Sequence, residues 1–147
     1  MPRGHFSVGD VEAVIPALVR IFVHVLQIRA GLRGIEAQLE RAGVRMSREE
    51  LLESDDGPPE IRRAKAVFRG FYEALADEIE RVRDLGGEVK DVETGLVDFP
   101  GRRGGEEILL CWRLGEKKLG FWHPVDSGFA GRRPVDEDVE RAPQPAD

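Results

Sequence analysis

The chain has 147 residues, 41% hydrophobic and 34% charged, a composition typical of a soluble globular domain rather than a disordered or membrane-embedded one. Its net charge is −6 at pH 7, and most of it belongs to residues 134–147, which hold five acidic side chains and one arginine. The nearly neutral remainder has no field that would attract nucleic acid, so we expect no nucleic-acid partner.

The single cysteine and the N-terminal residues bear on localisation. Cys111 cannot form an internal disulfide, which fits a reducing compartment. The first ten residues lack the apolar core of a signal peptide. The most apolar stretch, residues 11–28, is interrupted by Glu12, Arg20 and His24. We therefore expect a cytoplasmic protein with no membrane partner.

The first long hydrophobic pattern predicts a helix over residues 7–42. Its apolar positions recur in steps of three and four, the repeat of a coiled-coil seam. Five further apolar residues widen the stripe beyond what one neighbouring helix covers, so we expect more than one neighbour. Pro16 lies inside the pattern and predicts either a kink or a short first turn. The seam is Val11, Val14, Leu18, Ile21, Val25, Ile28, Leu32, Ile35 and Leu39, and the five others are Ile15, Val19, Phe22, Val23 and Leu26.

A second amphipathic pattern predicts a helix over residues 58–85. It follows the break Asp55-Asp56-Gly57-Pro58-Pro59 and ends at Gly86-Gly87. Two helices of matched length with a modest connection predict an antiparallel helical hairpin. Since the wide stripe of the first helix needs more cover, we expect a homodimer that forms through the helices as a four-helix bundle.

The remainder predicts a small sheet, which gives an α+β fold. Residues 96–99, 108–113 and 118–123 have strand character, so a three-stranded antiparallel meander is expected within residues 88–123. Pro100 is expected to stop the first of these strands. The acidic, proline-containing residues 134–147 have no apolar period, and we expect a disordered tail there. Residues 1–133 then form a single domain.

A tight turn at Gly115-Glu116 fixes a definite strand register. In that register Ile108 opposes His123 and Cys111 opposes Gly120, so Cys111 and His123 point to opposite faces. A three-residue loop would reverse this result. With the tight turn, Cys111 is interpreted as a small buried hydrophobe rather than a nucleophile or ligand. The same register puts Trp112 and Trp122 on opposite faces, with one packed and the other exposed or bound to a partner.

The candidate binding cluster comes from the segment between residues 96 and 133. Asp98, His123 and Asp126 are one imidazole and two carboxylates, which suit a divalent metal or acid–base work. The alternative is structural: His123 bonds the backbone, Asp126 belongs to a turn, and Asp98 forms a salt bridge with an arginine. The arginines considered for that bridge are Arg102, Arg113 and Arg132. The full candidate cluster is Asp98, Trp112, Trp122, His123, Asp126 and Arg132.

Several of these segments together resemble a known family. They are Ile15-Pro16, Gly95–Pro100, Leu110–Glu116, Phe121–His123 and Gly128–Arg132. The sequence resembles an uncharacterised prokaryotic family, domain of unknown function 2203, over roughly residues 6–134. The resemblance implies membership in one defined fold. It implies no activity, cofactor or role for any residue.

Two hypotheses on function follow from the residues. The first is a cytoplasmic, homodimeric binding module that presents the aromatic sheet to a small anionic ligand or a protein. The alternative is an enzyme acting on a small anionic substrate, in which Asp98, His123 and Asp126 bind a metal or transfer protons. The sequence predicts no cofactor, and if a metal binds, those three residues are its expected ligands. Whether the protein is an enzyme stays open.

Overall fold

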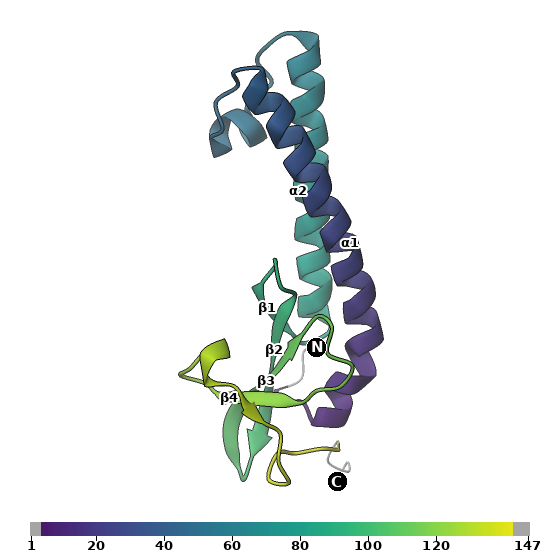
Figure 1. Ribbon diagram of the computed structural model, residues 1–147, viewed down its shortest axis with the longest axis vertical. Helices are drawn as coiled ribbons and strands as arrows, with labels where there is room; N and C mark the ends of the chain where they lie inside the picture. Colours follow the sequence, from purple (N-terminus) through teal and green to yellow (C-terminus); the bar gives the residue numbers. More distant parts are fainter. Residues whose placement is uncertain (1–3, 143–147) are drawn as a thin grey trace. The chain divides into compact units, whose positions relative to one another are not determined.

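The computed structural model describes residues 4–142 and forms an α+β fold in which two long helices are followed by a five-stranded antiparallel sheet (Figure 1). The helices are α1 (Val8–Arg41) and α2 (Pro59–Asp84), joined by a connection that contains the short π-helix Glu49–Glu53. The chain divides into two compact units. Of the described residues, the sheet unit contains 4–22 and 80–142, and the hairpin unit contains 23–79.

Local sequence signals explain where the helices begin and end. Before α1, the Ser7 hydroxyl accepts from the Asp10 amide, and the Asp10 carboxylate accepts from the Ser7 amide, a reciprocal capping box. Gly43 and Gly86 follow α1 and α2 with φ of 80° and 99°, a conformation that glycine adopts without strain. Pro16 lies inside α1, whose helical assignment continues on both sides of it.

The hairpin unit is built around a core between the two helices and their connection. Ile28, Leu32 and Leu39 from α1 pack with Phe68 from α2 and Leu51 from the π-helix. The small residue Gly31 lets the Phe71 ring approach the α1 backbone, because a Cβ on Gly31 would lie 2.4 Å from the end of that ring. Gly34, one turn further on, has no atom within 4 Å of such a Cβ.

These two glycines give a matched pair of variants. Gly34→Ala is expected to stabilise the hairpin unit by up to about 1 kcal/mol, the difference in helix propensity between alanine and glycine. Gly31→Ala gains the same propensity but must displace Phe71, so we expect a net loss of about 1–2 kcal/mol. Urea denaturation followed by circular dichroism measures both. Equal effects of the two substitutions would contradict the close packing of Phe71 on Gly31.

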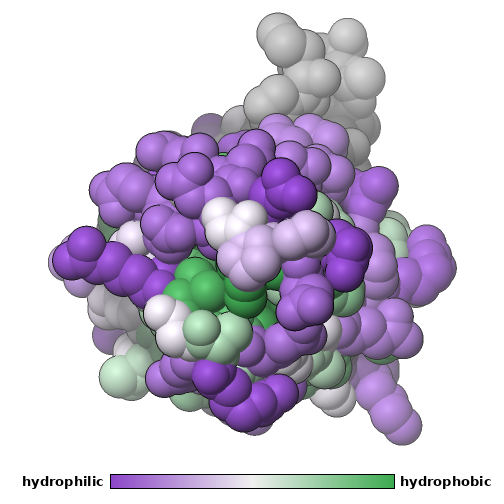
Figure 2. Space-filling view, turned by 90° about the horizontal axis from the view of Figure 1, so that it is seen from above, coloured by the Kyte–Doolittle hydropathy of each residue, from purple (hydrophilic) through white to green (hydrophobic). Residues whose placement is uncertain are grey.

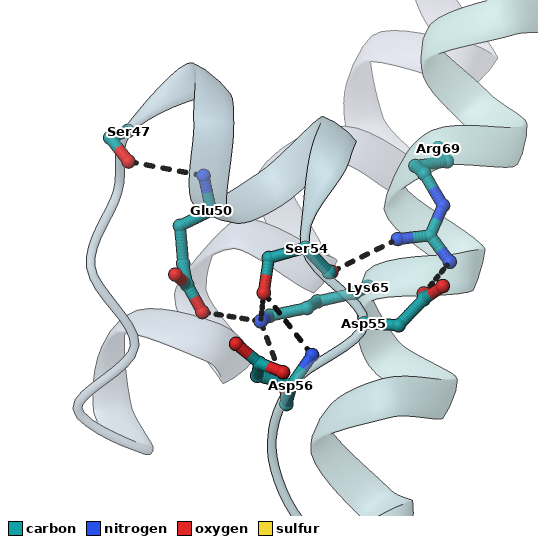
Figure 3. A network of polar contacts seen from close by, with 7 residues as sticks. All are labelled: Ser47, Glu50, Ser54, Asp55, Asp56, Lys65 and Arg69. Carbon is teal, nitrogen blue, oxygen red and sulfur yellow. Dashed lines mark hydrogen bonds and ion pairs between the residues drawn. The ribbon is translucent and has the colours of Figure 1, made fainter.

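A fully buried lysine fixes the connection between the helices (Figure 3). Lys65 Nζ forms an ion pair with Glu50 and donates to the Asp56 carbonyl at 3.0 Å. It also lies 3.4 Å from the Ser54 hydroxyl. A buried ammonium is costly unless it is paired, so these contacts hold the π-helix against α2. Figure 2 shows the end of the molecule where this connection lies as a mostly hydrophilic surface around a small hydrophobic area.

The sheet has five strands rather than the expected three, in the order β1-β2-β3-β4-β5. Its strand β2 passes through Pro100, which therefore does not stop it. The Pro100 carbonyl accepts from the Phe6 amide and so points away from β3. The missing N–H of Pro100 would point the same way, and no ladder bond to β3 is lost. The strands are β1 (Glu88–Asp91), β2 (Leu96–Arg103), β3 (Glu106–Arg113), β4 (Phe121–Pro124) and β5 (Arg133–Pro134).

The predicted register between β3 and β4 is wrong by one residue. Leu109, not Ile108, opposes His123, and Phe121, not Gly120, opposes Cys111. The tight turn at Gly115-Glu116 does not close the hairpin, because residues 114–120 form a longer loop. The contacts that hold this loop include the bond from Trp112 Nε1 to the Glu116 carbonyl at 2.9 Å and the bond from the Leu119 amide to Glu12 at 3.1 Å. A one-residue shift moves every side chain of β4 to the other face.

Residues 134–142, expected to be part of a disordered tail, form defined contacts in the structure. Val139 is buried and pairs with Arg103 in a β-bridge. Arg103 also binds Asp136 through both its Nε and a terminal nitrogen, and these hydrogen bonds hold the pKa of Asp136 below its usual value. The backbone of α1 adds bonds to this segment, since the Val8 amide donates to the Glu140 carbonyl. The remainder of the expected tail, residues 143–147, lies outside the described residues.

Candidate functional site

Both tryptophans lie on the sheet face that packs against α1. Trp112 opposes Val97 and Trp122 opposes Leu110, which places both rings on the same side of the sheet. The Trp112 ring is fully buried with its centroid 6.2 Å from that of Phe22, and Trp122 is 6% exposed. The predicted split of the tryptophans between two faces is therefore wrong, for the same register reason. Neither ring is available as an exposed aromatic contact.

The opposite face of the sheet brings together Asp98 from β2, Cys111 from β3 and His123 from β4. Asp98 and Cys111 are direct cross-strand partners, and His123 stands diagonally across from Cys111 on the next strand. One potential ligand atom from each residue lies within 4.8 Å of those of the other two. All three side chains are buried, at 4%, 0% and 2% exposure. We call these three residues the Asp98–Cys111–His123 cluster.

The hydrogen bonds of His123 indicate a proton or a metal ion between its ring and Asp98. Nδ1 lies 2.9 Å from the Pro124 carbonyl, which can only accept, so Nδ1 carries a proton. In neutral imidazole Nε2 is then an acceptor, and it faces Asp98 Oδ2 at 3.0 Å. Two acceptors at this distance need a proton or a metal ion between them. The second oxygen, Oδ1, is buried and has no hydrogen-bond partner among the described residues.

The Cys111 thiol completes the cluster in its protonated form. Burial raises the pKa of Cys111 to about 12, and the negative charge of Asp98 acts in the same direction. Arg132 acts in the opposite direction. It lies beside this face, donating to the Cys111 carbonyl at 3.1 Å and to both Glu116 oxygens at 2.7 and 2.9 Å. Cys111 is therefore not activated as a nucleophile, because only the thiolate reacts.

A pocket of about 330 Å³ opens onto the cluster. Asp98 and His123 line it, together with apolar and polar residues. Lys90 adds one cation at the wall, and Ser127 adds a hydroxyl. A pocket whose wall combines apolar side chains with a carboxylate, an imidazole, an amine and a hydroxyl is large enough for a small polar molecule. The other lining residues are Leu96, Leu109, Val125, Gly128 and Phe129.

Several candidate residues have partners that differ from those expected. The partner of Asp98 is His123, not Arg102, Arg113 or Arg132. Asp126 is exposed in the turn after β4 and does not belong to the cluster. Arg132 stacks on Phe121 with 4.1 Å between guanidinium carbon and ring centroid, and its ion pair is with Glu116. The guanidinium of Arg132 is thus neutralised by a carboxylate of the same chain.

The comparison with protein families identifies the chain. The family model described as uncharacterized conserved protein (DUF2203) matches residues 5–135. The chain belongs to the DUF2203 family. All three members of the cluster lie within the residues that match. No curated protein and no solved structure matches the chain.

Sequence reasoning placed two of the three cluster residues of this DUF2203 protein in a common site and missed Cys111. The position of Cys111 relative to His123 depends on whether the β3–β4 loop has an odd or an even number of residues, because this number decides the face of every residue on β4. The three-residue alternative predicts Cys111 and His123 on one face, and the observed loop of residues 114–120 also has an odd number of residues. No sequence pattern predicts that Lys90 and Ser127 line the pocket, because their positions depend on how distant segments fold together.

Proposed function

We propose that the Asp98–Cys111–His123 cluster binds one divalent transition-metal ion, with Zn²⁺ the best match. A carboxylate, a thiolate and an imidazole are the three ligand types that Zn²⁺ takes in proteins. Tetrahedral zinc with ligand distances of about 2.0–2.3 Å separates its ligand atoms by about 3.3–3.8 Å. Side chains whose ligand atoms already lie within 4.8 Å need to close by only about 1 Å.

The single observation that carries the proposal is the orientation of His123. Its Nδ1–H donates to a backbone carbonyl, the arrangement that fixes the ring of a metal-ligating histidine and turns Nε2 toward the ion. Nε2 then meets the Asp98 carboxylate at 3.0 Å, a position that suits a proton or a metal ion. The buried, unpartnered Oδ1 of Asp98 supports the proposal, since a second acceptor at this position suits a cation as well.

Three protein ligands leave the fourth position of a tetrahedral ion open. Open positions distinguish catalytic zinc sites from structural ones, which are closed by four protein ligands. We propose that this position faces the pocket lined by Asp98 and His123, where a water molecule or a small anion completes the coordination. The proposal favours the metal-dependent alternative over a module that presents an aromatic surface, because both tryptophans are buried.

Zinc binding by four variants tests the proposal. Wild-type protein is expected to bind one Zn²⁺ per chain in equilibrium dialysis, and Co²⁺ to show a thiolate charge-transfer band in its absorption spectrum. Zinc binding is expected to weaken more than about 100-fold in each of the variants Cys111→Ser, Asp98→Asn and His123→Gln. Loss of a residue that only supports a metal ligand costs about 10- to 100-fold. Asp126→Asn is the matched control and should bind like wild type, since Asp126 is exposed outside the cluster.

Circular dichroism of each variant shows whether its fold is retained. Cys111→Ser should remove the Co²⁺ charge-transfer band even if weak binding persists. The absence of stoichiometric zinc binding by folded wild-type protein would overturn the proposal. Equal losses in Asp126→Asn and in the cluster variants would overturn it too, because the ion would then bind elsewhere.

A further inference from the structure

Helix α1 exposes large aliphatic side chains on the side away from its core seam. Val19, Val23 and Leu26 are 38%, 47% and 45% exposed, whereas Leu18, Phe22 and Val25 on the core side are at most 2% exposed. The sequence predicted more than one neighbour for this helix, and these three residues are the part of the wide stripe that the described residues do not cover. An apolar stripe of this kind is typical of an interaction surface.

The exposed stripe extends along one face of α1 in both directions. Its positions are separated by steps of four and three residues, so they lie along one side of a helix with 3.6 residues per turn. Apolar and small residues fill the middle, an acidic residue stands at one end and a basic residue at the other. Glu12 is half-buried and the others are exposed. We call this set the α1 stripe: Glu12, Pro16, Val19, Val23, Leu26, Ala30 and Arg33.

We infer that two copies of the chain pair through the α1 stripe in antiparallel orientation, with Val23 of both copies at the two-fold axis. Reversing the stripe about Val23 sets Val19 against Leu26 and Pro16 against Ala30. The same reversal sets Arg33 against Glu12, whose Oε2 accepts from the Leu119 amide of its own chain, so opposite charges meet at both ends of the pair. A surface that is complementary to its own reversed copy is the requirement for a two-fold symmetric dimer.

The charge pattern selects this orientation over a parallel one. In a parallel pair each stripe residue would meet its own copy, so Glu12 would face Glu12 and Arg33 would face Arg33. Like charges at contact positions are unfavourable.

The helix is also long and apolar enough to cross a membrane, with a mean hydropathy of 1.8 in its most apolar window. Arg20, exposed within the apolar part of the helix, and the charged ends of the stripe favour a protein partner over lipid.

Cysteine cross-linking of the full-length protein tests both the pairing and its direction. Val23→Cys is expected to form a disulfide-linked dimer in high yield under mild oxidation, because residues at the axis face their own copies. Ala30→Cys is the matched control on the same stripe. The antiparallel pair separates its two copies of residue 30 by roughly 21 Å along the axis. A disulfide needs α-carbons within about 7 Å, so Ala30→Cys should stay monomeric on denaturing gels.

A mixture of Val19→Cys and Leu26→Cys proteins adds a second readout. Each variant alone should cross-link poorly, while the refolded mixture should give the dimer that joins position 19 to position 26. Wild-type protein reports any background from Cys111, which is buried. Equal cross-linking of Val23→Cys and Ala30→Cys would overturn the antiparallel pairing in favour of a parallel one.

The oligomeric state without cross-links completes the test. Light scattering of wild-type protein at micromolar concentration should give twice the chain mass of 16.4 kDa. Val23→Glu, which places two carboxylates at the axis, should give a folded monomer by circular dichroism. A wild-type monomer, or co-flotation of the protein with zwitterionic phospholipid vesicles in place of dimer formation, would overturn the inference. Zinc binding is measured at Asp98, Cys111 and His123, none of which belongs to the α1 stripe, so the two proposals fail separately.

Discussion

Zinc affinity of the wild-type protein is expected to rise at least about tenfold for each pH unit between pH 6 and pH 7. Burial raises the pKa of Cys111 to about 12, so its thiol is protonated throughout this range. A metal binds the thiolate, and each ion that binds must therefore displace the thiol proton. Displacing one proton makes the apparent affinity rise tenfold per pH unit while the pH stays below the thiol pKa.

The number of protons that zinc displaces from the protein is a direct readout of the metal–thiolate bond. Isothermal titration calorimetry in buffers with different ionisation enthalpies counts the released protons directly. Cys111→Ser is the control, since serine has no thiol proton to lose, and its proton count should be lower by about one. Zinc binding that is independent of pH in the wild type would contradict a metal–thiolate bond.

Replacing Trp112 with alanine is expected to destabilise the sheet unit by about 3–5 kcal/mol, the usual cost of truncating a buried aromatic side chain. The ring is fully buried against Phe22, and its Nε1–H donates to the Glu116 carbonyl. The substitution leaves a cavity and also an unpartnered carbonyl in the loop after β3. Urea denaturation followed by far-ultraviolet circular dichroism measures the loss without depending on tryptophan fluorescence.

Val125→Ala provides the comparison for this substitution. Val125 is 57% exposed, so its truncation should change the free energy of unfolding by no more than about 0.5 kcal/mol. If Trp112 instead served as an exposed binding residue, the Trp112→Ala protein would be as stable as wild type. A Trp112→Ala midpoint equal to that of Val125→Ala would therefore contradict the burial of the ring and restore the aromatic surface as a candidate for binding.

The helices were predictable because their signals are local. Apolar residues recur in steps of three and four between residues 11 and 39, a pattern that predicts one buried face of a helix. That face is buried in the structure. The capping pair Ser7 and Asp10 and the glycines after each helix act within a few residues of themselves. Pro100 shows the limit of a local rule. Its effect on a strand depends on which side of the strand needs an N–H, and this is a property of the neighbouring strands.

The candidate site was predictable in part. Asp98 in a strand of apolar neighbours indicated a buried carboxylate with a partner, and His123 was named in the same cluster. Asp126, three residues after His123, was predicted to belong to the same cluster, but it lies exposed in the turn after β4. The predicted burial of Cys111 is confirmed at 0% exposure, but the tight turn expected at Gly115-Glu116 put it on the face opposite His123. The loop is longer because Trp112 and Glu12 bind its backbone, and these contacts join segments distant in sequence.

The sequence by itself determined the fold class, the two helices, the central strands and the concentration of chemically versatile residues between residues 96 and 133. Only the tertiary structure decided which of those residues share a face. Side chains alternate along a strand, so a shift of one residue in the β3–β4 register exchanges the two faces of β4. That shift depends on contacts between the loop, Trp112 and α1, which exist only once the sheet unit has folded. In the observed register Cys111 and His123 lie on one face of the sheet, and both tryptophans lie on the other, buried face.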